Sequence, residues 1–360
     1  MFRKYPYAKR VRVEPERGYT KLARRYPTKF DALITFEEEG HKYFYKGEPM
    51  SCPSVSSLAK RFHPDGAKMN MPLMANQSSK MMKRKTREWF AEIWANTSGS
   101  DNAFTLFEPG EFEPNEFERK RQFEHRLLVH LREIERFEQI IVEKKRPTVD
   151  EALADVVGFD DHLHPDQIQK NWNYAAQVGT DIHEFIEAKL NGVDLPIPEI
   201  PIIGSKEYDM VNEFFEENKL DWWRTELRVY SEKYNVVGSF DGAYVTSWNE
   251  DGTPASLGLA DWKRTNKIRS IPEDDPDYRK NSKQRYDGPL NHLVPSTRMD
   301  YTLQLSTYAA IIEDELNLPV TELWLGVIYG DNDKMMRIDV PYMKAEAHAM
   351  MQYVKDLEEL

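Results

Sequence analysis

The stretch Tyr234 to Thr265, YNVVGSFDGAYVTSWNEDGTPASLGLADWKRT, decides the fold. Two runs of alternating apolar and polar residues flank residues 249–254 (NEDGTP), and this arrangement predicts two antiparallel strands joined by a turn. If the hairpin folds symmetrically about Asp251, Asp241 lies directly opposite Asp261 on the same face. Cβ atoms of such a pair are roughly 4.5–5.5 Å apart.

Side chains alternate along a strand, so Lys263 is expected on the face of Asp261, while Trp262 points toward a helix-covered core. Two carboxylates placed opposite each other repel, which raises one pKa or recruits a cation. The hard oxygen ligands favour Mg²⁺ or Mn²⁺, and Lys263 could then orient a water molecule or stabilise charge that develops on a phosphate. An ordinary ion pair of Lys263 with either Asp at a sheet surface is the alternative.

Upstream of the hairpin, residues 178–187 (VGTDIHEFIE) have the pattern of a helix. His183 is a candidate third metal ligand on this helix, and imidazole would make the site tolerant of Mn²⁺. A structural role for His183 is the alternative.

Downstream, residues 300–311 (DYTLQLSTYAAI) predict an amphipathic helix with Gln304 at the edge of its apolar stripe. Gln304 and Tyr308, one turn apart, could hydrogen-bond a phosphate or support the metal ligands. Tyr308 could equally be a core residue.

Working outward from the hairpin, the patterns predict an α/β chain with α+β mixing, in which helices flank a mixed central sheet. The expected elements are a hairpin at 32–45, a short helix from Ser54 to Arg61, helices at 77–96, 114–145, 165–190 and 205–219, strands at 224–231, 234–247 and 256–263, a helix at 300–316, strands at 322–329 and 335–340, and a final helix. We expect three parts: residues 1–30 as a flexible basic arm, 31–160 as a hairpin with a helical accessory region, and 161–360 as the core.

The charge of the chain is unevenly distributed. The 360 residues carry a formal net charge of −12, yet residues 1–30 hold ten Lys/Arg and two Glu. This arm could contact DNA phosphates, act as an import signal or be a solvated tail. An overall negative charge is compatible with a nucleic-acid enzyme if basic patches are local and cations neutralise the acidic site.

A second basic cluster, WKRTNKIR at 262–269, follows the hairpin directly. Arg264, Lys267 and Arg269 are expected to contact a phosphate backbone there. The next segment, 270–299, has no apolar period and is expected to be a mobile flap over DNA, because loops of this length are uncommon unless functional or disordered.

Taken in order, four motifs resemble the RecB-like branch of the PD-(D/E)XK nucleases: Gly179-Thr180 with His183, Gly238-Ser-Phe-Asp241, Asp261-Trp-Lys263, and Gln304 with Tyr308. The span 171–328 resembles the exonucleases of large DNA viruses and phages and the mitochondrial genome-maintenance exonucleases. Residues 41–62 are similar to the N-terminal hairpin and helix of these enzymes.

The resemblance implies a restriction-endonuclease-like core and assigns roles to the motif residues. His183, Asp241, Asp261 and the main-chain carbonyl of Trp262 would bind Mg²⁺ or Mn²⁺, with Lys263 catalytic. Glu226 falls where many relatives carry a Glu before the hairpin. It is expected to support or ligate a second metal ion, so that the site would hold one or two ions. Thr180, Gln304 and Tyr308 are expected near the nucleic acid.

We therefore expect an intracellular, metal-dependent DNA exonuclease that acts on single- or double-stranded ends in replication, repair or recombination of the viral or phage type. A single-strand-binding or annealing protein would be its partner, the host cytoplasm or nucleus its compartment, and no membrane is implied. With only Cys52 and no GxxxxGK[ST] sequence, neither an iron–sulfur cluster nor an ATP site is expected. An RNA endonuclease on the same fold and an inactive DNA-binding protein are the alternatives.

Overall fold

The computed structural model describes residues 21–37, 40, 42–64, 165–193, 205–329 and 332–358. By its internal contacts the chain forms two compact units, one of residues 1–66 with 179–360 and one of residues 67–178. The helices expected at 77–96 and 114–145 lie outside the described residues. The three-part division of the chain stays a prediction.

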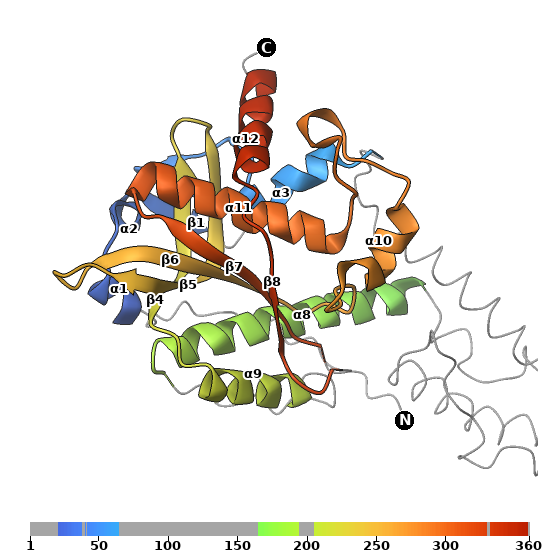
Figure 1. Ribbon diagram of the computed structural model, residues 1–360, viewed down its shortest axis with the longest axis horizontal. Helices are drawn as coiled ribbons and strands as arrows, with labels where there is room; N and C mark the ends of the chain where they lie inside the picture. The colour runs from blue at the N-terminus through green and yellow to red at the C-terminus, as the bar shows by residue number, and fades with distance from the viewer. Residues whose placement is uncertain are drawn as a thin grey trace, which may run out of the picture. The chain divides into compact units, whose positions relative to one another are not determined.

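A five-stranded mixed sheet forms the centre of the first unit (Figure 1). Its strands, in spatial order, are β4 (Trp222–Ser231), β5 (Val236–Trp248), β6 (Pro254–Lys263), β7 (Val320–Val327) and β8 (Met336–Asp339). Neighbouring strands are antiparallel except β6 and β7, which run parallel. A helix, α11 (Thr297–Leu316), connects this parallel pair. The predicted α/β class, with a mixed sheet between helices, is confirmed.

Helices cover both faces of the sheet (Figure 1). On one face lie α11 and then α12 (Lys344–Glu358); on the other lie α9 (Ser205–Glu217) and, from Gly179 onward, α8 (Pro165–Leu190). The α11 face is sealed by a buried aliphatic stripe that includes Leu305 and Ile312. Ser296 caps α11 by accepting a hydrogen bond from Met299 N, and Asn317 ends it in the left-handed conformation.

An aromatic cluster joins α9 to the opposite face of the sheet. Phe215 of α9 lies 5.6 Å, centroid to centroid, from Trp262, which also packs 5.6 Å from Trp222 and 5.2 Å from Trp324. Trp262 is 1% exposed. The prediction that it points into a helix-covered core is therefore confirmed.

The β5–β6 hairpin has the predicted register in the part that leads to Asp241 and Asp261. The pairs from Gly242 with Ala260 to Val245 with Leu257 are symmetric about Asp251, so Asp241 and Asp261 follow directly at the end of this ladder. A bulge shifts the pairing by one residue near the turn, at Ser247, and the shift is reversed at Trp248.

The N-terminal elements begin with α1 (Lys21–Arg25) and α2 (Lys29–Leu33). A small sheet of β1 (Ile34–Glu37), β2 (Lys42–Tyr45) and β3 (Glu48–Pro49) follows, and then α3 (Val55–Leu58) with the 3-10 turn η1 (Ala59–Phe62). The hairpin expected at 32–45 is confirmed, and a short helix begins after Ser54 as expected, although its second half is a 3-10 turn and the Ser54 side chain makes no capping hydrogen bond.

Residues 21–30, the last third of the expected basic arm, are folded. Leu22 and Phe30 are buried, and Asp31 pairs with the buried guanidinium of Arg224 on β4. The segment is anchored because it contributes apolar side chains to the core, which a solvated arm would not do. Residues 1–20 lie outside the described residues.

The segment expected as a mobile flap, residues 270–299, is a folded connection with short helices: η2 (Pro272–Asp274), α10 (Pro276–Asn281) and η3 (Gly288–Leu290). Tyr286 and Leu290 are buried in it. Asp275 accepts from Arg298 at 2.9 Å. The absence of an apolar period misled the prediction, because anchors at irregular spacing suffice to fold a segment of this kind.

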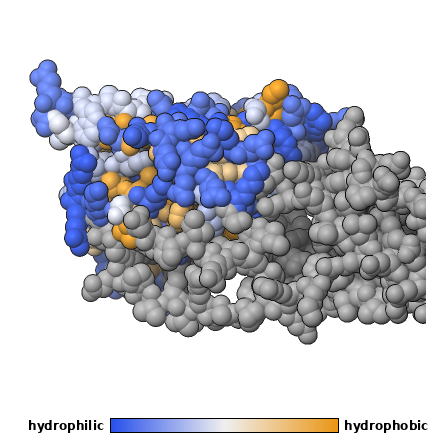
Figure 2. All heavy atoms as spheres, turned by 90° about the horizontal axis from the view of Figure 1, so that it is seen from below, coloured by the Kyte–Doolittle hydropathy of each residue, from blue (hydrophilic) through white to orange (hydrophobic). Residues whose placement is uncertain are grey.

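None of the described helices combines the length and apolarity needed to cross a membrane. On the described part of the face shown in Figure 2, hydrophobic residues occur in small separate groups among hydrophilic ones.

Candidate metal centre

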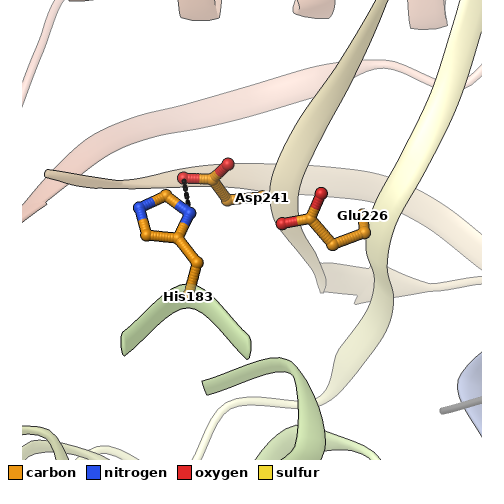
Figure 3. A group of neighbouring side chains, drawn as sticks. All are labelled: His183, Glu226 and Asp241. Atoms are coloured by element: carbon orange, nitrogen blue, oxygen red, sulfur yellow. Dashed lines mark ion pairs between the residues drawn. The ribbon is translucent and has the colours of Figure 1, made fainter. Parts of the chain in front are cut away.

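Three side chains from three elements converge at one end of the hairpin (Figure 3). His183 comes from α8, Glu226 from β4 and Asp241 from β5, and one ligand atom of each lies within 4.8 Å of the others. One nitrogen and two carboxylate oxygens form a donor set for a divalent cation. These residues could hold a metal ion.

Asp241 is positioned by the neighbouring strand. Its Oδ2 accepts a 2.6 Å hydrogen bond from the main-chain N–H of Trp262 and lies 3.6 Å from Nδ1 of His183. A main-chain donor cannot rotate away, so this bond fixes the carboxylate toward the imidazole.

Glu226 occupies an unusual backbone conformation. Its φ is +46°, in the left-handed region, although it lies inside β4 between Thr225, which pairs with Gly242, and Leu227, which pairs with Phe240. A non-glycine residue in this region costs roughly 1–2 kcal/mol, and such strain gathers at functional sites. Oε2 of Glu226 accepts a 3.4 Å hydrogen bond from Oγ of Ser239, a residue that the sequence analysis did not single out.

The His183 ring is set up as a neutral ligand. Burial and the nearby Lys263 ammonium lower the pKa of His183 to about 4, although the charge of Asp261 and a hydrogen bond to the main chain of Trp262 oppose them. At neutral pH the imidazole is therefore uncharged and can donate a lone pair to a metal. The Trp262 main chain, expected to supply a carbonyl ligand, faces the same imidazole.

Asp261 lies deeper than the three converging side chains. Its side chain has no exposed surface. Nζ of Lys263 lies 2.6 Å from Oδ2 of Asp261 and 3.8 Å from Oδ2 of Asp241. Gln304 Nε2 donates a 3.2 Å hydrogen bond to Oδ1 of Asp261. The predicted arrangement of Asp241, Asp261 and Lys263 is thus present. The three residues whose ligand atoms are close enough to share a metal ion, however, include Glu226 and not Asp261.

Two carboxylates of this centre, Asp241 and Asp261, have raised pKa values. Burial and the charge of Asp241 raise the pKa of Asp261 to about 7, and burial also raises the pKa of Asp241. The pKa of Lys263 is raised by the two carboxylates despite its own burial, so the lysine stays an ammonium group at neutral pH. When Asp241, Asp261 and Glu226 are all ionised, they leave two negative charges beside one ammonium, and a divalent cation would offset these charges.

Tyr308 joins two of the sequence motifs by packing. It is 2% exposed, its ring lies 5.9 Å from that of Phe240, and a Cβ on Gly238 would come within 2.8 Å of its ring. The Tyr308 ring therefore occupies the space that a side chain at position 238 would need. Tyr308 has the place of a core residue, and its expected contact with nucleic acid stays a prediction.

Arg264, Lys267 and Arg269, expected to contact a phosphate backbone, and Thr180, expected near the nucleic acid, lie in different environments. Arg264 is bonded inward, 3.0 Å from Oε1 of the fully buried Glu207. Arg269 Nη1 donates to the carbonyl of Asn266 at 2.6 Å. Lys267 and Thr180 are exposed. No described contact tests their binding of nucleic acid, but Arg264 is already committed to a partner that sequence spacing could not reveal.

Comparisons with known proteins add no family. No model of a protein family matches the chain, and no curated protein matches it. Among solved structures, a protein of Eubacterium rectale described as a "putative exonuclease" matches with a TM-score of 0.29 and 11% identity, over 51% of this chain and 68% of the other. A TM-score this low carries no argument about function.

Proposed function

We propose that this chain is a divalent-metal-dependent nuclease that hydrolyses phosphodiester bonds. The observation that carries the proposal is the convergence of His183, Glu226 and Asp241 within 4.8 Å beside a buried Lys263–Asp261 pair. Bound at these three residues, Mg²⁺ or Mn²⁺ would polarise a phosphoryl oxygen and lower the pKa of a bound water molecule.

The chain's own residues supply the remaining chemistry. Lys263 is a permanent cation, held by Asp261 and lying 4.9 Å from the ring centroid of Tyr301. A protonated lysine cannot take a proton from water, so its role is to bind the phosphate and stabilise the charge that develops during hydrolysis. Gln304 keeps Asp261 oriented and Trp262 N–H keeps Asp241 oriented.

The finer proposal is that the substrate is DNA, degraded from its ends during replication, repair or recombination, with a single-strand-binding or annealing protein as partner. It is supported by the motif set rather than by any contact in the structure. RNA cleavage and nucleic-acid binding without cleavage are the competing outcomes of the test.

The test is digestion of end-labelled linear DNA, closed circular DNA and RNA with Mg²⁺, Mn²⁺ or EDTA, alongside Lys263→Ala. Metal-dependent loss of linear DNA alone, absent in the variant, is the expected result. Cutting of circles would indicate an endonuclease, and cutting of RNA alone would replace the substrate. Mn²⁺ binding, measured by calorimetry on Glu226→Gln and Asp241→Asn, reports on the metal centre independently of activity; full retention of binding in both would overturn it.

A further inference from the structure

One arginine beside the candidate metal centre has no described ionic partner. Arg228 follows Glu226 by two residues on β4, so the two side chains share a face of the strand. It is half-buried, and among the residues that the structure describes no carboxylate lies within ion-pair distance of it. Its guanidinium carbon instead lies 5.8 Å from the ring centroid of Phe36 on β1.

A half-buried guanidinium that has no ionic partner in the described part of the chain indicates an anionic ligand. The cation–π contact with Phe36 holds the group in place but leaves its charge unneutralised. Arginine presents a planar fork of donors that matches phosphate oxygens. Two residues along a strand span roughly 7 Å, close to the separation of neighbouring phosphates in an extended single strand.

Two aromatic rings accompany Arg228. Phe36 pairs directly with Tyr43 across the β1–β2 hairpin, and their ring centroids are 4.7 Å apart at an interplanar angle of 50°. Both side chains are half-buried. Because Phe36 lies against the Arg228 guanidinium and Arg228 is two residues from Glu226 on β4, this end of the hairpin lies beside the candidate metal centre.

We propose that Arg228, Phe36 and Tyr43 form a nucleotide subsite next to the metal centre. Arg228 binds a phosphate adjacent to the one that is cut, and the two rings stack against its base. A base can stack on a side chain only when it is unpaired from the opposite strand, so the substrate is single-stranded at this point. This inference rests on the proposed nuclease function and adds the strand state of the substrate.

Binding, measured without cleavage, tests the subsite. Fluorescence anisotropy would follow a labelled single-stranded oligodeoxynucleotide of roughly 12 nucleotides, within the usual site sizes of single-strand binders. An oligodeoxynucleotide of the same length with abasic sites and a blunt duplex would be compared with it. Ca²⁺ would replace Mg²⁺ to limit hydrolysis.

Each variant has its own expected signature. Phe36→Leu and Tyr43→Leu weaken binding of the ordinary oligodeoxynucleotide about fivefold or more and leave the abasic one unchanged, because only the ordinary one has bases to stack. Arg228→Gln weakens both and lowers the salt dependence by about 0.7 in slope, as loss of one phosphate contact on a single strand does. Arg228→Lys restores the slope.

Arg337→Gln is the matched control. Arg337 on β8 also lies over an aromatic ring, 5.1 Å from the centroid of Trp324, but pairs with Glu322 and Asp339. We expect its loss to change neither affinity nor slope. Thermal unfolding of every variant separates lost contacts from lost folding, and leucine keeps apolar volume in the hairpin. If either leucine variant does not fold, Arg228→Gln still decides the phosphate contact and the other leucine variant the stacking.

The outcomes separate this inference from the proposed function. Metal-dependent cleavage with unchanged binding in the Arg228 and ring variants would overturn the subsite and leave the nuclease standing. The expected binding pattern without any cleavage would support the subsite and count against the nuclease. Equal effects on ordinary and abasic oligodeoxynucleotides in the leucine variants would overturn base stacking.

Discussion

Lys263 and Asp261 form a buried ion pair, with Nζ 2.6 Å from Oδ2 and no exposed surface on the Asp261 side chain. Breaking such a pair from one side leaves an uncompensated charge. We expect Lys263→Met to lower the free energy of unfolding by about 3 kcal/mol in urea titrations without metal.

Lys334→Met is the control for this loss of a cation. Lys334 is mostly exposed and pairs with Glu213 at the surface, so its loss should cost less than about 1 kcal/mol. Equal stability of the two variants would show that the Lys263–Asp261 pair is not buried in solution.

The raised pKa of Asp261 predicts a pH dependence. Because the folded-state pKa, about 7, lies above the ordinary 3.8, the protonated form is favoured by folding. Its stabilising contribution is full below pH 3.8 and is lost as the pH rises through 7. Asp261→Asn, which mimics the neutral carboxyl group, should make the unfolding free energy of the metal-free protein less dependent on pH between 4 and 7.

The affinity for metal should increase over the pH range in which Asp261 loses its proton. A divalent cation favours the ionised carboxylate, so Mn²⁺ affinity should rise with pH up to about 7 and binding should release protons. Calorimetry in two buffers of different ionisation enthalpy measures this release. Proton release of the same size in Asp261→Asn would assign it to another group.

The left-handed backbone conformation of Glu226 predicts how glycine and alanine at this position would affect stability and metal binding. At φ +46° glycine avoids the Cβ penalty, so Glu226→Gly should be more stable than Glu226→Ala by about 1 kcal/mol, while neither binds metal as the native chain does. At Arg228, whose φ is not positive, the order should reverse, with glycine below alanine. The same order at both positions would mean that Glu226 is not held in the left-handed region.

These relationships divide the site into parts that the sequence could and could not predict. The position of Asp241 and Asp261 at the end of the hairpin ladder and the inward Trp262 followed from strand alternation and a strong turn, because both depend on local spacing. The φ of Glu226 could not be predicted, since glutamate has no preference for that conformation. The ion pair of Arg264 with Glu207 joins residues 57 apart on different elements, and no local pattern records such a contact.

Two glycines of the motif set should respond in opposite ways to alanine. At Gly238 a Cβ would meet the Tyr308 ring at 2.8 Å, so Gly238→Ala should lower the free energy of unfolding by about 1–3 kcal/mol. Gly179 lies inside α8 with its nearest neighbour, Arg264 Cβ, at 3.9 Å, so Gly179→Ala should raise it by up to about 1 kcal/mol. Urea titration of both variants decides; destabilisation at Gly179 would mean that the space beside Arg264 does not accommodate a Cβ atom.

Arg264 and Lys267 were expected to share one role, yet their surroundings differ. Arg264 is bonded to the fully buried Glu207 at 3.0 Å, whereas Lys267 is exposed. Arg264→Gln removes the cation that pairs with this buried carboxylate, so it should lower the free energy of unfolding by about 3 kcal/mol. Lys267→Gln should leave stability within about 0.5 kcal/mol.

Nucleic-acid binding should show the reverse order. If Lys267 contacts a phosphate, Lys267→Gln lowers the slope of log affinity against log salt concentration by the contribution of about one phosphate contact, and Arg264→Gln does not. Urea titration and anisotropy at several salt concentrations measure both quantities on the same variants. A reduced salt slope for Arg264→Gln, with stability unchanged, would mean that Arg264 leaves Glu207 to bind the backbone and would restore the role that its position in the sequence first suggested.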